Sequence, residues 1–215
     1  MITAKRNRLA LPLPACLALI IAVTFGGCGK DKPRDTGTAP PANGGTSSDS
    51  QLISVPSTIE IILEAEDAVV TPPMVVVTAD AHNTSEERLQ ASGGRYVDLP
   101  DEVGKGDEAG GKIVFKPVIE KAGRYRLWAR VWWFDPCGNS FGLVVDNGPQ
   151  AIIGEDGTYE TWQWLTLKGD DGVFRLTKGK HTIEFRNTED GPRLDQIYLT
   201  TNLDEQAQPQ GILVP

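Results

Sequence analysis

Cysteine is scarce in this sequence. Of three cysteines among 215 residues, Cys16 and Cys28 lie near the N-terminus and only Cys137 lies further along the chain. A single cysteine cannot form an intrachain disulfide in the main body of the protein, so the fold must depend on a hydrophobic core or on a bound metal. Cys137 has no histidine or basic cluster near it in the sequence to favour a thiolate, and we interpret it as a small buried loop residue rather than a nucleophile.

Histidine and the common catalytic motifs are scarce as well. His82 and His181 are far apart, which excludes a paired-histidine zinc motif, and no Gly-x-Ser-x-Gly sequence is present. Residues 106–112 have the spacing of a phosphate-binding loop, but the Ser or Thr that should follow is missing. The acidic pairs at 155–156 and 189–190 each precede a glycine and are more typical of hairpin turns than of glycosidase carboxylates. The sequence therefore predicts no catalysis.

Basic residues are outnumbered by acidic ones. The chain has 21 Lys and Arg against 29 Asp and Glu, a net charge of −8, and loss of residues 1–27 would remove three basic residues and no acidic one. The remaining net charge of −11 argues against nucleic acid or an anionic lipid surface as a partner. It is compatible with a bound divalent cation.

The one long apolar run lies at the N-terminus. Residues 9–25 are uncharged and mostly apolar, they follow three basic residues, and two glycines separate them from Cys28. This pattern predicts a secretory signal over residues 1–27. The cysteine after the cut resembles the bacterial lipobox, which implies lipidation of Cys28 and a location in the bacterial cell envelope, periplasmic or on the cell surface. A spanning anchor is the alternative, but the run is short for a span and Pro12 and Pro14 interrupt it.

The rest of the chain divides into three parts. Residues 28–57 are rich in Gly, Pro, Ser, Thr and Asp and predict a flexible tether. Residues 58–203 contain many short apolar segments separated by turn residues, which indicates one all-β domain, a β-sandwich or jelly roll. Residues 204–215 predict an irregular tail. The expected strands are 59–64, 74–78, 95–99, 112–119, 124–133, 142–146, 151–154, 161–167, 173–177, 181–187 and 194–200.

The two faces of the expected strand 124–133 differ in character. Tyr125, Leu127, Ala129, Val131 and Trp133 alternate on one face and predict a core. The opposite face alternates guanidinium and indole groups: Arg124, Arg126, Trp128, Arg130 and Trp132. That face suits cation–π stacking or a sugar platform, or else it is an outer sheet face on which arginine stems cover the tryptophans. We favour the outer-face interpretation for Trp128 and Arg130, and a ligand role for Trp132 and Trp133 at the strand end.

Three carboxylates of the first and last strands are predicted to converge. Asp195 shares a face with Ile197 and Leu199 by strict alternation, and Glu64 and Glu66 follow the face of Ile62. If the two strands pair, the carboxylates cluster and need either a metal or cationic partners, because a buried lone carboxylate is costly. Hard oxygen ligands favour Ca²⁺. The alternative is pairing with arginines such as Arg130 or Arg186.

Several segments resemble the family 6 and family 35 carbohydrate-binding modules. The opening Ile-Leu-Glu-Ala-Glu-Asp-Ala at 62–68 is similar to the start of these modules, and so is Ala-Gly-Arg-Tyr-Arg-Leu-Trp-Ala-Arg at 122–130. The segments 144–148, 176–185 and the closing 194–199 continue the resemblance in the right order. The resemblance covers about residues 60–200.

The resemblance implies a galactose-binding-like β-jelly roll with a structural Ca²⁺. The residues that match the family's metal ligands are Glu64, Glu66 and Asp195. It also implies a glycan site in the loops at one end of the sandwich, in the regions 132–140, 159–164 and 187–193. The loop residues expected to stack on a sugar ring or to bond its hydroxyl groups are Trp133, Tyr159, Trp162 and Trp164, and Asp135, Asn139, Asn187, Glu189 and Arg193. Core packing is the alternative for each tryptophan taken alone.

We therefore expect a lipid-anchored carbohydrate-binding module that lies outside the cytoplasm, binds a polysaccharide and performs no catalysis. The membrane contact would be the lipid alone, and an envelope protein or enzyme is a further potential partner. One alternative is a protein–protein adaptor of the envelope with the same fold, and another is a small polysaccharide-degrading enzyme. A broad exposed apolar patch would favour the adaptor, whereas a narrow groove with polar neighbours would favour sugar.

Overall fold

The computed structural model describes residues 57–78, 88, 90–100, 110–154 and 157–214. The predicted signal, Cys28 and nearly all of the predicted tether lie outside these residues. Within them, no helix has the length and apolar character needed to cross a membrane.

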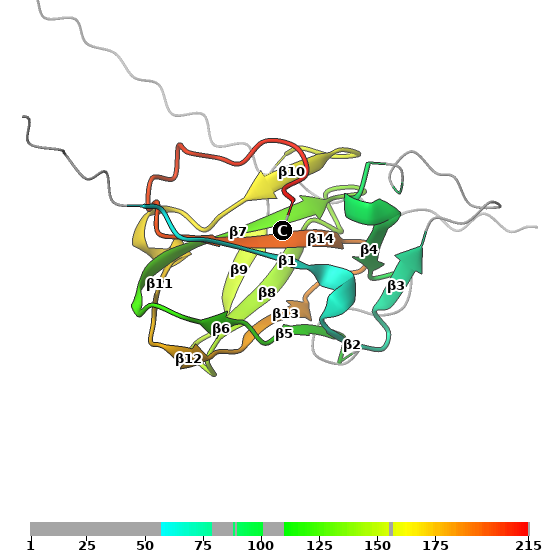
Figure 1. Ribbon diagram of the computed structural model, residues 1–215. Helices are drawn as coiled ribbons and strands as arrows, with labels where there is room; N and C mark the ends of the chain where they lie inside the picture. The colour runs from blue at the N-terminus through cyan, green and yellow to red at the C-terminus, as the bar shows by residue number, and fades with distance from the viewer. Residues whose placement is uncertain (1–56, 79–87, 89, 101–109, 155–156, 215) are drawn as a thin grey trace, which may run out of the picture. The chain divides into compact units, whose positions relative to one another are not determined.

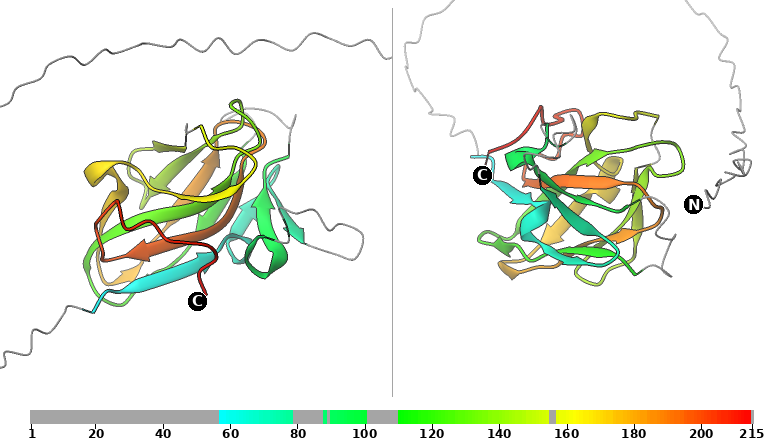
Figure 2. Two further views of the ribbon diagram at one scale, coloured as in Figure 1. Left: turned by 90° about the horizontal axis from the view of Figure 1, so that it is seen from above. Right: turned by 90° about the vertical axis from the view of Figure 1, so that its right-hand side faces the viewer.

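Two antiparallel sheets pack face to face to form a β-sandwich (Figure 1, Figure 2). The larger sheet has the order β10-β7-β14-β4-β3, with β1 also paired to β14 and β11 to β7. Its strands are β1 (Glu60–Glu64), β3 (Val75–Thr78), β4 (Arg95–Asp98), β7 (Gly123–Trp132), β10 (Trp162–Leu165), β11 (Val173–Leu176) and β14 (Arg193–Thr200). The second sheet has the order β2-β5-β13-β8-β9, formed by β2 (Val69–Thr71), β5 (Lys112–Phe115), β8 (Ser140–Val145), β9 (Ala151–Gly154) and β13 (Ile183–Asn187). A small pair joins β6 (Val118–Ile119) to β12 (Gly179–Lys180).

The connections are those of a jelly roll. The chain passes from the larger sheet to the second at β1–β2, β4–β5, β7–β8 and β11–β13, and it returns at β2–β3, β5–β7, β9–β10 and β13–β14. The predicted fold class is therefore confirmed. Because β1 pairs with β14, the first and last strands of the domain lie side by side.

The core lies between the sheets and uses one face of each strand. Leu127, Ala129 and Val131 of β7 are fully buried there, opposite aromatic residues such as Phe185 of β13. Phe185 contacts two further rings edge-on, those of Phe115 and Phe141. The period-two alternation predicted for β7 is thus correct, and it leaves the second face of the larger sheet, called here the outer face, to carry Trp128, Arg130 and Trp132.

Some expected elements differ from the structure. The segment 112–119, expected as one strand, is two strands in different pairings, and the chain turns at Lys116-Pro117. Proline has no N–H for a ladder, so a break at this point has a simple cause. Strands β2 and β12 were not expected; they have three and two residues, too few for a period to be read.

The C-terminal segment has no regular secondary structure but packs on the larger sheet. Residues 201–214, called here the C-terminal strap, run back along the outer face of the larger sheet (Figure 1). Arg126 Nε donates to the Leu203 carbonyl at 2.8 Å, and Leu213 packs against the cluster of Trp128, Trp164 and Tyr198. Residues 204–214 form no helix or strand, as expected of an irregular tail, but their packing on the sheet was not predicted, because the segment shows no period that would indicate it.

A histidine–aspartate pair joins the turn after β8 to the turns around β12. His181 is buried, its Nδ1 lies at hydrogen-bond distance from Asp146 Oδ2, and its Nε2 lies 2.8 Å from the Thr177 carbonyl. Burial lowers the pKa of His181, but the hydrogen bonds to Asp146 and Thr177 and the Asp146 charge outweigh it, so the pKa is raised above 6.5. Two acceptors around one ring favour the imidazolium form.

The pair predicts a pH-dependent contribution to stability. Because the folded-state pKa of His181 is raised, the stabilisation is complete below the unfolded pKa near 6.5 and is lost as pH rises through the folded value. Asp146→Asn, which keeps an acceptor for the Thr182 N–H, should lower the free energy of unfolding by about 0.5–1 kcal/mol at pH 6 and by less at pH 9. Urea titrations at the two pH values measure this difference. An equal loss at both pH values would show that the His181 charge contributes nothing.

Candidate functional site

The predicted carboxylate cluster forms where β1 pairs with β14. Glu64 lies opposite Gln196 in the register, and Gln196 Nε2 donates to Glu64 Oε1 at 2.9 Å. Ser92, in the 3₁₀ turn η2 (Ser92–Gly94), bridges the two strands: its Oγ donates to Glu64 Oε1 at 3.0 Å and its N–H to Asp195 Oδ1 at 2.9 Å. Glu66 follows in the turn η1 (Ala65–Asp67), and its Oε1 lies 3.9 Å from Arg95 Nε. The first and last strands pair as expected, and Ser92 links Glu64 to Asp195, while Glu66 follows in the next turn.

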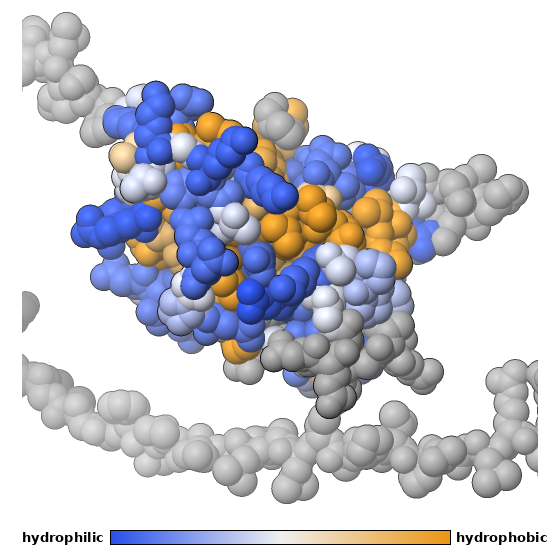
Figure 3. All heavy atoms as spheres, turned by 90° about the horizontal axis from the view of Figure 1, so that it is seen from below, coloured by the Kyte–Doolittle hydropathy of each residue, from blue (hydrophilic) through white to orange (hydrophobic). Residues whose placement is uncertain are grey.

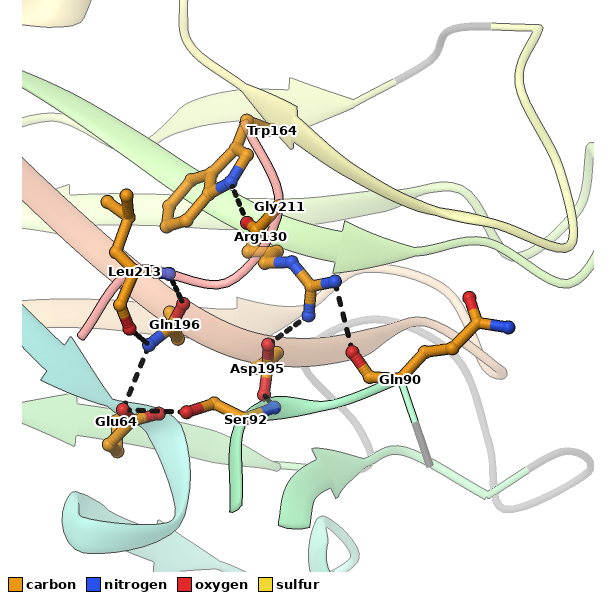
Figure 4. Close-up of polar contacts among 9 residues, drawn as sticks. All are labelled: Glu64, Gln90, Ser92, Arg130, Trp164, Asp195, Gln196, Gly211 and Leu213. Atoms are coloured by element: carbon orange, nitrogen blue, oxygen red, sulfur yellow. Dashed lines mark hydrogen bonds and ion pairs between the residues drawn. The ribbon is translucent and has the colours of Figure 1, made fainter. Parts of the chain in front are cut away.

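Asp195 lies in an irregularity of β14 and pairs with an arginine. The register of β14 against β7 shifts between Leu194 and Gln196, which is a β-bulge. Asp195 is fully buried and forms an ion pair with Arg130 (Figure 4), whose side chain leaves β7 on the outer face. The prediction that Asp195 shares the face of Ile197 and Leu199 is therefore wrong, because the bulge interrupts the alternation. The arginine alternative is correct for Asp195 and Arg130, while Arg186 bonds Glu184 instead.

Two oxygens of the cluster have no partner among the described residues. They are Glu64 Oε2 and Glu66 Oε2, both buried. Burial raises the pKa of Glu66, aided by the charge of Glu64, and burial raises the pKa of Asp195 to about 6 although Arg130 and the Ser92 N–H oppose the shift. Orphaned buried carboxylate oxygens fit a hard cation such as Ca²⁺. In the described part of the chain, however, no three His, Cys, Asp or Glu side chains already converge as a metal site.

A second group of residues lies at the loop end of the outer face. In the register, Trp162 of β10 lies opposite Trp132 of β7, and Trp132 lies opposite Arg193 of β14, which in turn faces Asp98 of β4. This row places aromatic, cationic and acidic groups from four strands side by side. Tyr96, on the same face of β4, contacts Trp162 edge-on with ring centroids 5.5 Å apart.

Arg193 is held between aromatic rings. Its Cζ lies 4.0 Å from the Trp132 ring centroid and 5.7 Å from that of Tyr96, and its Nε donates to Asp98 Oδ1 at 3.1 Å. Arg130 repeats the arrangement with its Cζ 5.1 Å from the Trp162 ring. We call Trp132, Arg193, Tyr96, Trp162 and Arg130 the cation–π stack. A guanidinium fixed in this way keeps its orientation for a polar ligand, because little rotamer freedom remains.

One exposed aromatic ring borders the stack, and the other candidate loop residues are half-buried. Phe134, beyond the end of β7, is 51% exposed and its ring lies 6.1 Å from that of Trp132. Trp162 and Tyr159 are half-buried. Asp135 and Glu189 are also half-buried, but they stabilise the loops: Asp135 Oδ1 accepts from the Cys137 N–H at 2.8 Å, and Glu189 Oε2 accepts from Asn139 N and Ser140 Oγ at 3.0 and 2.9 Å.

Four of the predicted ligand residues are buried and do not face solvent. Trp133 is 0% exposed and packs against Phe141, so its proposed stacking role is wrong. It lies one residue past the end of β7, and its side chain continues the alternation of that strand and faces the core. Trp164 is 3% exposed, and its Nε1 donates to the Gly211 carbonyl of the C-terminal strap at 2.8 Å. Asn139 and Asn187 are 8% and 2% exposed. Tyr159 is half-buried and packs against the core between the sheets, so Trp162 and Arg193 remain at the loop end.

Sequence reasoning missed three residues of this site. Tyr96 and Asp98 lie on β4, where a four-residue strand gives a weak signal, and Phe134 lies just beyond the two tryptophans. The Arg-Tyr-Val-Asp sequence at 95–98 shows no alternation of polar and apolar residues, and only the sheet order brings it next to β14.

The molecule also carries a hydrophobic surface away from the loop end. Figure 3 shows hydrophobic side chains gathered between hydrophilic ones on the side where β2, β5, β6 and β12 lie. Val69 of β2 and Val118 of β6 are 54% and 52% exposed. A groove of about 360 Å³ runs between β1 and β5, with Val69, Val114 and Leu63 among its lining residues.

Solved structures that are similar to this chain include carbohydrate-binding modules. A family 35 carbohydrate-binding module from Clostridium thermocellum is 22% identical, with 66% of this chain and 97% of the module covered and a TM-score of 0.49. The family 35 module of Cellvibrio japonicus Abf62 is 18% identical, with 66% and 92% covered and a TM-score of 0.45. A β-(1,4)-mannanase of Podospora anserina that contains such a module is 21% identical at a TM-score of 0.49; 72% of this chain is covered but only 28% of the mannanase. No protein-family model and no curated protein matches the sequence.

The Arg130–Asp195 pair predicts strong coupling in stability. Arg130→Met should lower the free energy of unfolding by about 3–5 kcal/mol, because it leaves the buried Asp195 carboxylate without its cation. The double variant Arg130→Met, Asp195→Asn should lose less than the sum of the single losses. Urea denaturation in EDTA measures all four proteins of the cycle. Additive losses would show that the two side chains do not act as a pair.

Proposed function

We propose that this chain is a non-catalytic carbohydrate-binding domain that binds a polysaccharide at the loop end of the sandwich. The observation that carries the proposal is the cation–π stack with a half-buried Trp162 and an exposed Phe134 at its rim. Aromatic faces stack on the C–H groups of a pyranose ring, while a fixed guanidinium donates hydrogen bonds to hydroxyl or carboxylate groups.

The chemistry of the loop end suits binding rather than hydrolysis. Hydrolysis of a glycosidic bond needs two carboxyl groups, one of them with a raised pKa, on either side of the bond. Among the described residues, the carboxyl groups with raised pKa values are Glu66 and Asp195, and both belong to the buried carboxylate cluster. We therefore propose that the domain holds a polysaccharide and leaves its cleavage to another protein.

The proposed setting is the bacterial cell envelope. A lipid on Cys28 would tether the domain to a membrane, in the periplasm or at the cell surface, through the residues that precede β1. No other membrane contact and no nucleic acid partner is proposed, because the mature chain is acidic. A tethered binding domain would retain polysaccharide near the cell or near a partner enzyme.

A structural Ca²⁺ is part of the proposal. Glu64 and Glu66 would hold it through the two buried oxygens that have no partner among the described residues, and Asp195 lies beside them across Ser92. The bound cation would supply positive charge to carboxylates that are otherwise costly to bury.

A protein–protein adaptor is the second candidate. It is favoured by the exposed valines on β2 and β6 and by the groove between β1 and β5 (Figure 3). This surface is separate from the loop end, so an adaptor role would use other residues than sugar binding does.

Substitution of Trp162 tests the proposed glycan site. In a chain that starts at residue 28 with Cys28→Ser, Trp162→Ala should lower the affinity for a bound polysaccharide about tenfold, through loss of stacking. Arg193→Ala should lower it similarly, whereas Arg175→Ala, an exposed arginine of β11, should not change it. A glycan array followed by affinity electrophoresis on the bound polysaccharide measures the effect. Binding that survives both loop-end changes, or no binding to any glycan, would contradict the proposal and favour the adaptor.

The proposed Ca²⁺ site predicts a metal-dependent stability. Free Ca²⁺ at 100 times its Kd should raise the free energy of unfolding by about 2.7 kcal/mol relative to EDTA. Glu66→Gln should abolish the difference, and Asp67→Asn, an exposed neighbour in η1, should leave it intact. Thermal unfolding in Ca²⁺ and in EDTA provides the comparison. Identical curves for the unsubstituted chain would exclude this site while leaving the glycan proposal standing.

A further inference from the structure

We propose that the outer face of β7, β10 and β14 is a peptide-binding groove that the C-terminal strap occupies in cis. The partner that it fits in trans is a polypeptide segment in extended conformation with a leucine two residues after a glycine. The groove is separate from the loop-end site, so this inference does not depend on sugar binding.

The groove recognises peptide main chain through Gln196. Gln196 is fully buried; its Oε1 accepts from the Leu213 N–H at 3.1 Å and its Nε2 donates to the Leu213 carbonyl at 2.7 Å (Figure 4). Gln196 Nε2 also donates a hydrogen bond to Glu64 Oε1 at 2.9 Å, which fixes the orientation of the side-chain amide. Both contacts to Leu213 go to backbone atoms of one residue, so the side-chain amide imitates a neighbouring strand. An unmodified sugar carries no N–H, and in an N-acetyl group the N–H and C=O of the single amide point in opposite directions. Neither offers the pair that Leu213 presents to Gln196, so we favour a peptide.

Two further contacts define the sequence that fits. The Leu213 side chain packs against the aromatic cluster of Trp128, Trp164 and Tyr198. Trp164 Nε1 donates to the Gly211 carbonyl at 2.8 Å, and Gly211 has a φ of 64°, a left-handed conformation that favours glycine. Gly-x-Leu is therefore the motif that this groove selects.

The strap is held in a way that permits exchange. It forms no strand within residues 201–214, and Ile212 and Val214 are 42% and 83% exposed. A cavity of about 380 Å³ remains between the strap and β10. Trp128 Nε1, in the cluster that the strap covers, is buried without a partner among the described residues, and such a donor disfavours the covered state. The strap therefore fills its groove incompletely. A segment of another chain can bind there once the strap is displaced or removed.

The test uses a synthetic peptide of residues 202–214 as the probe. It should bind a chain truncated after Leu203 and bind the full-length chain at least about tenfold more weakly, because a tethered strap competes at a millimolar effective concentration. Gln196→Leu in the truncated chain should weaken binding about tenfold or more, and a peptide with Leu213→Asp should not bind. Arg175→Ala in the truncated chain is the matched control and should leave the affinity unchanged. Calorimetry measures the affinities, and circular dichroism confirms the fold of each variant.

A full-length variant keeps the test decisive if truncation prevents folding. In Leu213→Asp the strap remains covalently present but loses its packing residue, and the same peptide should then bind this chain. A folded truncated or Leu213→Asp chain that fails to bind the peptide would overturn the proposal, as would binding that is indifferent to Gln196→Leu. If both variants unfold, the strap is a fixed part of the core and exchange is excluded. A truncated chain that gains affinity for polysaccharide but not for the peptide would assign the face to glycan instead.

Discussion

The ion pair between Arg130 and Asp195 holds the other features of the outer face in place. Both side chains are almost or completely buried, and a buried pair is stable only when its remaining donors and acceptors are satisfied. Here Arg130 also donates to the Gln90 carbonyl at 3.1 Å and lies over the Trp162 ring, while Asp195 accepts from the Ser92 N–H. The pair thereby fixes the positions of β7, β10, β14 and the turn η2 relative to one another. The loop-end stack lies on one side of this pair and the Gln196 groove on the other.

A single β-bulge decides which groups meet on this face. The extra residue between Leu194 and Gln196 lets Leu194 and Ile197 both face the core while Asp195 reaches Arg130. With strict alternation from Ile197, Asp195 would face the core and its carboxylate would be buried among hydrophobic side chains at a large cost. The bulge also sets the register in which Gln196 lies opposite Glu64. The carboxylate cluster and the peptide contact of Gln196 therefore depend on the same irregularity.

The sequence predicted the sandwich, the alternation of β7 and the meeting of the first and last strands, because these follow from period-two patterns and strand pairing. It did not predict the bulge, since one added residue leaves no compositional mark, and so the face of Asp195 was wrong. Trp133 was predicted to bind a ligand, although the alternation of β7 places its side chain on the core face, where it is fully buried. The roles of Tyr96 and Asp98 depend on the sheet order, which local sequence does not encode. The strap was missed because its contacts are made through backbone atoms of residues such as Leu203 and Gly211.

The outward-facing side chains of β7 have different structural roles along the strand. Arg126 anchors the start of the strap through the Leu203 carbonyl, Trp128 packs beneath its end, Arg130 neutralises the bulge carboxylate, and Trp132 supports Arg193 at the loop end. Alternating guanidinium and indole groups therefore do not form one continuous sugar platform, because only the last row lies beside exposed aromatic surface. Glu64 accepts a hydrogen bond from Ser92 in the carboxylate cluster and is connected through Gln196 to the strap. A cation bound at Glu64 Oε2 would withdraw charge from the carboxylate whose Oε1 accepts from the Gln196 amide, so cation binding and the binding of a peptide on the outer face are expected to be energetically linked.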